Sequence, residues 1–217
     1  MFRDRVDAGR QLAKKLMQYG GKSAVVLALP RGGVVLGFEI ARALSVPLDI
    51  IAVRKIGHPF HPEYAIGAVD ESGARILNEA EAATLDEKWL AVETEREMNE
   101  AKRRSSVYRG EKRAEPLAKK IAIVVDDGIA TGLTMQLAVR VVRALKPSKI
   151  VVAVPVAPAE ALRALKDEGA DETIVLEPPE TFMGAVGAHY MKFDQVEDDE
   201  VIRLLKLAHE AGNKHSG

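Results

Sequence analysis

Short apolar runs alternate with helical patterns along most of the chain, and this alternation limits the possible fold more than any other feature. The apolar runs cover residues 24–29, 48–53, 120–125, 149–154 and 172–176. Helical spacing is found over residues 34–44, 133–145 and 157–169. Apolar strands joined through helices form parallel sheets that are covered on both faces, with right-handed crossovers. The sequence therefore predicts an α/β fold, a Rossmann-like doubly wound parallel sheet, in a single domain over residues 1–217.

Two segments depart from this alternation. Residues 54–73 contain Gly, Pro and His with few element signals, so we expect a flexible loop in which residues 65–69 form a strand that pairs with 74–78. Residues 177–195 are irregular and hold several of the few aromatic residues, and they predict a small hood over one edge of the sheet.

Three further helices are expected. One lies near the start of the chain, with an apolar face from Ala8 to Leu16, and one covers residues 197–212. Residues 80–108 are charged and strongly helix-forming, with an inner stripe predicted at Leu85, Trp89, Val92 and Arg96. This third helix either packs on the core or forms a dimer arm.

Composition excludes several classes of function. The 217 residues carry a net charge of −1, which does not indicate bulk attraction to nucleic acid or to an anionic membrane. The chain has no cysteine, which excludes disulfides, thiolate nucleophiles and Cys-ligated zinc. No apolar run approaches the roughly 20 residues of a membrane span. We therefore expect a cytoplasmic protein with no nucleic-acid or membrane partner.

The loops that follow the predicted strands indicate an anionic ligand. Ligands of such sheets gather at the carboxyl ends of the strands, where the sequence places residues 30–33, 54–63, 126–134 and 155–158. Gly128 and Gly132 permit tight turns, and the free N–H groups of the helix that follows favour an anion. Thr131 and Thr134 add hydroxyl donors, so residues 128–134 suit a phosphate monoester. No lysine follows Gly132, so the triphosphate-binding P-loop pattern is absent.

Two adjacent aspartates, Asp126 and Asp127, stand at the end of a buried strand. Like charges repel, so these carboxylates are not expected to contact a phosphate. Carboxylates suit vicinal hydroxyls or a metal ion, which predicts a sugar phosphate with its hydroxyls over the aspartates. A turn with a helix cap is the alternative explanation.

The stretch VVDDGIATGLT at residues 124–134 resembles the phosphoribosyl diphosphate (PRPP) motif of type I phosphoribosyltransferases. LPRGG at residues 29–33 is similar to that family's pyrophosphate loop, and VRK at residues 53–55 to the start of its flexible catalytic loop. The order of these motifs matches from roughly residue 20 to residue 176. The resemblance implies the type I phosphoribosyltransferase fold.

The resemblance also implies roles at the matching positions. Asp126 and Asp127 bind the ribose hydroxyls, and Mg²⁺ bridges the pyrophosphate and ribose hydroxyls through ligand oxygens and water, with no protein metal site. The other PRPP-binding positions are Arg31, Gly32, Gly33, Arg54, Lys55, Gly128, Ile129, Ala130, Thr131, Gly132, Leu133 and Thr134. Catalytic roles are expected for Arg31, Lys55, Asp126, Asp127 and, as a general acid or base, Glu63. The alternative for Glu63 is an ordinary surface residue, and the sequence favours that alternative slightly.

The acceptor is less constrained. Ala130 stands where 6-oxopurine enzymes carry an acid, so the loop looks more like adenine- and uracil-type enzymes. The hood supplies Phe182 and Tyr190 as candidates to stack on a base, although hood aromatics could equally anchor the segment. His58 and His61 lack an evident third ligand for a metal.

We therefore expect a phosphoribosyltransferase (a pentosyl glycosyltransferase) that moves the 5-phosphoribosyl group of PRPP to a nitrogen nucleophile, with a nucleobase as the expected acceptor, and releases pyrophosphate. Nucleotide salvage is the expected setting, and a homodimer the expected assembly. A PRPP-sensing regulator without transferase activity and a hydrolase that uses water are the alternatives.

Overall fold

The computed structural model has a central five-stranded sheet in the order β2-β1-β6-β7-β8, with every pair parallel. It describes residues 1–213, with the side chains at residues 63, 212 and 213 outside the description. The strands are β1 (Ala24–Ala28), β2 (Leu48–Ile50), β6 (Ile121–Val125), β7 (Lys149–Val154) and β8 (Glu172–Val175). The predicted parallel α/β architecture is confirmed.

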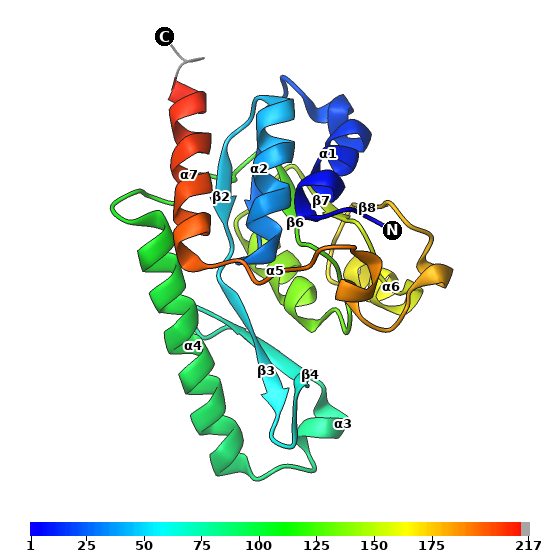
Figure 1. The fold of residues 1–217 in the computed structure, drawn as a ribbon. Helices are drawn as coiled ribbons and strands as arrows, with labels where there is room; N and C mark the ends of the chain where they lie inside the picture. The colour runs from blue at the N-terminus through cyan, green and yellow to red at the C-terminus, as the bar shows by residue number, and fades with distance from the viewer. Residues whose placement is uncertain (214–217) are drawn as a thin grey trace.

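Helices cover both faces of this sheet because its strands are apolar on both sides (Figure 1). Val26 and Ala28 pack under one set of helices, whereas Val25 and Leu27 pack under the other. The first set is α1 (Arg5–Leu16), α2 (Gly32–Leu44) and α7 (Asp198–Asn213), and the second is α5 (Leu133–Ala144) and α6 (Ala159–Asp167). None of the helices in the described range has both the length and the apolar character of a membrane span.

A second, antiparallel sheet replaces the predicted flexible loop. The strands β3 (Val53–His58), β4 (His61–Asp70) and β5 (Arg75–Leu77) pair in that order. The expected pairing of residues 65–69 with 74–78 is confirmed, but the loop assignment for most of 54–73 was wrong. Ile56, Ile66 and Val69 are buried together, and this apolar face fixes the strands.

The long charged helix is divided into two parts. The short helix α3 (Glu79–Ala82) is followed by α4 (Glu87–Arg109), which starts where the Asp86 carboxylate accepts a hydrogen bond from the Trp89 amide. Leu85 and Trp89 pack against the antiparallel sheet as predicted. Val92 is 67% exposed, so its place in the inner stripe was wrong. The inner face passes instead through Leu90 and Met98.

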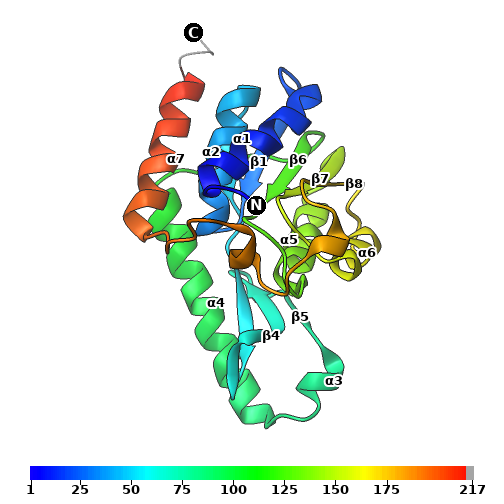
Figure 2. The same cartoon turned by 45° about the vertical axis from the view of Figure 1, so that its right-hand side comes forward.

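The hood is irregular, as predicted, with two short 3₁₀ turns, η2 (Pro179–Thr181) and η3 (Val186–His189). A third 3₁₀ turn, η1 (Met17–Tyr19), follows α1. The hood lies beside the first residues of the chain (Figure 2), where Phe2 and Tyr190 form a β-bridge. Their rings are also in contact, with centroids 5.4 Å apart. The first residues therefore hold the hood next to the ends of the central strands.

Candidate functional site

The acid pair and the Pro-Arg-Gly-Gly segment meet at the carboxyl ends of two neighbouring strands. Asp126 and Asp127 follow β6, and β6 pairs with β1, which leads into Gly32 and Gly33. A Cβ atom added to Gly32 would lie 1.9 Å from Asp127 Oδ2, and one added to Gly33 would lie 2.8 Å from the Val125 carbonyl oxygen. The two loops therefore touch, and only glycine fits between them. The peptide bond between Pro30 and Arg31 is cis.

Asp127 is held by a residue that sequence reasoning missed. Arg5 Nε donates a hydrogen bond to Asp127 Oδ2 at 2.7 Å, and the two side chains are only 11% and 16% exposed. Arg5 Nη1 also donates to the Asp194 carbonyl oxygen, and its guanidinium lies 3.8 Å from the centre of the Phe193 ring. Arg5 therefore links the start of α1, the acid loop and the hood. A cation in the first turn of a helix opposes the helix dipole, and this was the available signal.

Ionisation of the acid pair is unfavourable in its buried position. Burial, together with the negative charge of Asp127, raises the pKa of Asp126 well above its ordinary value. Burial also raises the pKa of Asp127, although Arg5 acts in the opposite direction. Asp126 Oδ1 accepts a hydrogen bond from the Asp127 amide at 2.8 Å. The site thus concentrates negative charge that a ligand with hydroxyl donors or a cation would stabilise.

Residues 128–134 form the turn into α5. Gly132 has φ +88° at the N-cap of α5 and supplies no side chain to cap the helix, so among the described residues no side-chain cap competes for the first-turn N–H groups. Ile129 is buried, and its amide donates to the Val156 carbonyl oxygen at 2.9 Å. Ala130 and Thr131 are exposed and line a cavity of about 380 Å³, to which Leu133 also contributes. This geometry is suited to an anion.

Gly128 and Thr134 lie in different surroundings. A Cβ atom added to Gly128 would lie 2.5 Å from Val186 in the hood and 2.9 Å from Val156. The loop therefore passes closely under the hood. Thr134 is partly buried in the first turn of α5.

Arg31 lies at the N-terminal end of α2 and faces the first turn of α7. Its Nη1 atom is 3.4 Å from Glu197 Oε2 and 3.6 Å from Asp198 Oδ1. The Glu197 side chain is 67% exposed. These ion pairs are long and solvated, and such pairs contribute about 0–1 kcal/mol each.

Arg54 and Lys55 stand on β3 and line a separate cavity of about 380 Å³, together with His58 and Trp89. Arg54 Nε forms a 2.8 Å ion pair with Glu97 of α4. The structure therefore places these two cations on the α4 side of the antiparallel sheet, in a different cavity from Thr131. The predicted acid or base Glu63 lies on β4, and its side chain falls outside the described residues.

The hood aromatics make contacts within the protein. Tyr190 is 6% exposed, and its hydroxyl donates to the Asp127 carbonyl oxygen at 2.6 Å. Phe182 stacks on His189, with ring centroids 5.5 Å apart. His189 Nε2 accepts from the Met183 amide, so Nδ1 carries the proton that is shared with Glu177 at 2.5 Å. Tyr190 thus positions the acid loop, and stacking of Tyr190 or Phe182 on a base stays a prediction.

Comparison with known proteins decides the family. A family model described as "Phosphoribosyl transferase domain" matches residues 3–190. The chain belongs to the phosphoribosyltransferase family. The matched region contains the acid pair, the Pro-Arg-Gly-Gly segment, Arg5 and the hood up to Tyr190.

Relatives of this phosphoribosyltransferase are similar over nearly its whole length. It is 44% identical over 211 residues to "Putative phosphoribosyl transferase Rv0571c" of Mycobacterium tuberculosis. The aligned region covers 96% of this chain and 47% of that protein. The chain thus spans about half the length of the curated relatives it matches. The crystal structure of TT1426 from Thermus thermophilus is 41% identical, with a TM-score of 0.76, and covers 94% of this chain and 97% of that one.

Replacing Asp126 by Asn is expected to stabilise this phosphoribosyltransferase at pH 7. The pKa of Asp126 is raised in the folded protein. Its contribution to the free energy of unfolding is therefore present at low pH and is lost as pH rises through the folded pKa. Asn removes this loss, and the stability advantage of the variant should therefore grow as pH rises above about 4, the ordinary pKa of an aspartate. Urea unfolding at a series of pH values measures it.

Asp171→Asn is the matched control with the opposite sign. Burial opposes ionisation of Asp171, but the Ile150 amide and Arg143 outweigh it and lower the pKa. Asp171 therefore stabilises the fold above its unfolded pKa, and the Asn variant should become relatively less stable as pH rises. If the stabilities of the two variants changed with pH in the same direction, the opposite pKa shifts assigned to Asp126 and Asp171 would be contradicted.

Proposed function

We propose that this chain transfers the 5-phosphoribosyl group of PRPP to the nitrogen of a nucleobase and releases pyrophosphate. One observation carries the proposal: the acid pair, the glycine pair and the uncapped start of α5 lie together at adjoining strand ends. PRPP has the matching groups, namely a ribose diol, a pyrophosphate and a 5-phosphate.

Each loop then has a distinct task. The 5-phosphate lies against the N–H groups of residues 128–134 and the hydroxyls of Thr131 and Thr134. The ribose hydroxyls donate to Asp126 and to the oxygen of Asp127 that Arg5 does not engage. The pyrophosphate lies along Gly32 and Gly33, where the absence of side chains lets the backbone approach closely.

These contacts favour displacement at the anomeric carbon of the ribose. The transition state has oxocarbenium character, and the leaving pyrophosphate gains negative charge. Arg31 adjoins the glycine pair and would stabilise that charge after leaving Glu197 and Asp198, and the acid pair holds the sugar while the bond breaks. Lys55 and Arg54 lie in a separate cavity, so their action requires a shift of the antiparallel sheet toward the glycine pair.

Magnesium fits the chemistry of these donors as an ion that arrives with the substrate. The described residues contain no group of three or more His, Cys, Asp or Glu that could hold a metal. Mg²⁺ is commonly bound by one or two carboxylates together with phosphate oxygens and water. Asp126 and Asp127 are the carboxylates in reach of such an ion, which would neutralise charge on the pyrophosphate when bound.

The acceptor proposal rests on the loop composition. Ala130 is exposed and cannot accept a proton from a base, which favours adenine or uracil over hypoxanthine or guanine. Glu63 remains a proposal as the acid or base. The test is pyrophosphate release from PRPP and Mg²⁺ with each of the four bases in turn.

Release with adenine or uracil only is the expected result. Asp127→Asn and Thr131→Val should weaken PRPP binding, by about tenfold for the loss of one charge-assisted hydrogen bond. Thr84→Val, at an exposed position between α3 and α4, is the control that should leave it unchanged. PRPP binding without turnover would point to a sensor, release without any base to a hydrolase, and no PRPP binding would overturn the proposal.

A further inference from the structure

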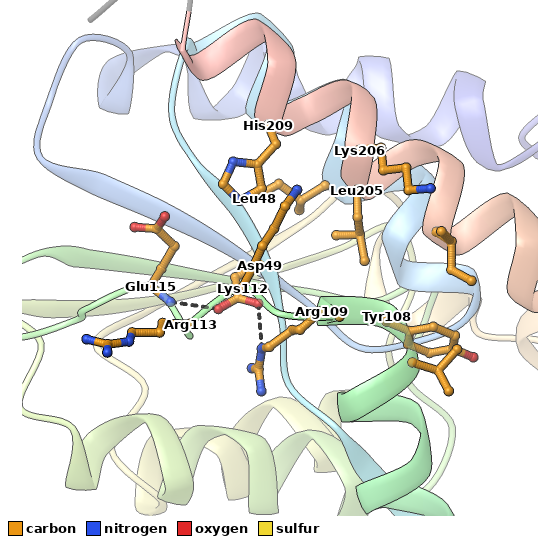
Figure 3. Close-up of a pocket in the computed structure, with 13 residues that line it drawn as sticks. Leu48, Asp49, Tyr108, Arg109, Lys112, Arg113, Glu115, Leu205, Lys206 and His209 are labelled. Carbon is orange, nitrogen blue, oxygen red and sulfur yellow. Dashed lines mark hydrogen bonds and ion pairs between the residues drawn. The ribbon is translucent and has the colours of Figure 1, made fainter.

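Another cavity lies along α7, apart from the two described above. The end of α4, the segment after it, β2 and the last turns of α7 enclose about 100 Å³ (Figure 3). None of residues 30–33 and 126–134 lines this cavity. Its near edge is Tyr108, whose hydroxyl donates to Asp198, the ion-pair partner of Arg31. Its far edge is His209, eleven residues or about 16 Å beyond Asp198 on α7. The cavity is therefore separate from the strand-end loops and borders the first turn of α7.

The floor of the cavity is apolar. Leu48 and Leu205 are 7% and 8% exposed, and Ile202 lies beside them. Val107, at the mouth, is 42% exposed. A hydrocarbon group placed on these side chains would lose contact with water, which stabilises binding by about 0.8 kcal/mol for each buried CH₂ group.

The carboxylates of this cavity are already satisfied within the protein. Asp49 accepts hydrogen bonds from Arg109 Nε at 2.9 Å and from the Glu115 amide at 2.9 Å (Figure 3). It also accepts one from the Ile50 amide at 2.7 Å. Glu115 pairs with Lys120 at 3.6 Å. Arg109 is also occupied, because its remaining nitrogens donate to Ser105, Glu71 and the Ile50 carbonyl oxygen. The acids therefore do not neutralise other cations of the cavity.

Three other cations line the same cavity. The charged groups of Lys112, Arg113 and Lys206 have no hydrogen-bond or ion-pair partner among the side chains that the structure describes. Figure 3 shows Lys112 and Lys206 around the hollow with His209, and Arg113 at its outer side. An apolar floor under unpaired cations is complementary to a small molecule with a short hydrocarbon chain and one anionic end.

We propose that this cavity binds a small aliphatic carboxylate. Its chain lies on Leu48, Ile202 and Leu205, and its carboxylate lies between Lys112 and Lys206. The volume of about 100 Å³ is smaller than the roughly 150 Å³ cavity that accommodates benzene. A chain of about four carbons therefore fits better than a ring system. This site does not depend on the function proposed for the strand ends.

Pentanoate is the probe, and amide chemical shifts of the ¹⁵N-labelled protein are the measurement. We expect shifts confined to residues 48–50, 107–115 and 202–209. Pentan-1-ol has the chain without the charge and should bind about tenfold more weakly. Acetate has the charge without three of the CH₂ groups and should bind about fiftyfold more weakly. Equal affinity for pentan-1-ol, or no saturable shift in these segments, would overturn the proposal.

Variants identify the cations. Lys112→Gln with Lys206→Gln should weaken pentanoate binding about fivefold and reduce its salt dependence. Lys102→Gln, an exposed cation of α4 that does not line the cavity, is the control that should change neither. Both lysines are exposed, so the double variant should fold normally. An unchanged affinity in the double variant would exclude the proposed carboxylate position.

Discussion

Replacing Arg5 by Gln is expected to lower the free energy of unfolding by about 3–5 kcal/mol, the usual loss when one partner of a buried ion pair is removed. The variant leaves the Asp127 carboxylate buried beside Asp126 without its cation. Arg5→Lys should recover only part of the loss, because a lysine cannot serve both Asp127 and the Asp194 carbonyl oxygen while stacking on Phe193. Chemical denaturation of the three proteins measures these differences.

The double variant with Asp127→Asn separates charge from packing. If the ion pair is the cause, the combined loss in stability should be smaller than the sum of the two single losses. Arg3→Gln is the control, because Arg3 is 73% exposed and its pair with Asp7 contributes about 0–1 kcal/mol. An Arg5→Gln protein as stable as Arg3→Gln would refute the assignment.

The same substitution should change the pH dependence of PRPP binding. Arg5 holds down the pKa of Asp127 against the effect of burial, so its loss should raise that pKa further. Asp127 accepts the ribose hydroxyls in its ionised form. When the pH is lowered, Arg5→Gln should therefore lose PRPP binding before the wild type does. PRPP affinity measured from pH 5 to pH 9 tests this shift.

Replacing Gly32 by Ala is expected to reduce PRPP affinity by at least about tenfold, with a loss of stability in the range of about 1–3 kcal/mol that overpacking causes. The added methyl would lie 1.9 Å from Asp127 Oδ2 and 2.9 Å from Arg5 Nε. The backbone at Gly32 and the ion pair of Arg5 with Asp127 must move apart to admit the methyl group. Gly32 belongs to the proposed pyrophosphate contacts, and Asp127 belongs to the proposed sugar contacts. Calorimetric titration with PRPP and thermal unfolding measure the two effects.

Gly20→Ala provides the matched control. Gly20 has φ −59° and ψ 136°, which alanine adopts freely, and its nearest neighbour to an added Cβ is the Met17 carbonyl oxygen at 3.2 Å. Its effect on PRPP affinity should be negligible. Equal PRPP affinities for the Gly32→Ala and wild-type proteins would mean that the glycine pair does not contribute to the site.

The acid pair and the loop after it could be predicted from sequence because their chemistry is contiguous. Strand, carboxylates, glycines and hydroxyls follow one another within residues 121–134, so local patterns were sufficient. Arg5 contacts Asp127 across 122 positions of the chain. Nothing local to either residue specifies that contact, which arises only when α1 packs beside the strand ends.

The pairing of β3 with β4 was missed for a different reason. Gly57 was treated as a loop signal, whereas Gly67 lies in the segment 65–69 that was predicted as a strand, and each glycine permits a close approach within the sheet. A Cβ atom added to Gly57 would lie 2.5 Å from the Pro62 carbonyl oxygen, and one added to Gly67 would lie 2.6 Å from Leu77. Both glycines are therefore strand residues that accommodate neighbours, and for Gly57, next to His58 and Pro59, the sequence did not distinguish this role from a turn.

The ion pairs of Arg31 are long, so another anion can replace its present partners. An anion that arrives beside Gly32 and Gly33 competes only with Glu197 and Asp198, at 3.4 and 3.6 Å. Asp198 keeps the Tyr108 hydroxyl at 2.6 Å and Arg103 at 3.0 Å, so departure of Arg31 leaves no orphaned carboxylate. An anion bound at the glycine pair would replace one set of counter-ions of Arg31 by another, and the first turn of α7 holds the arginine when no ligand is present.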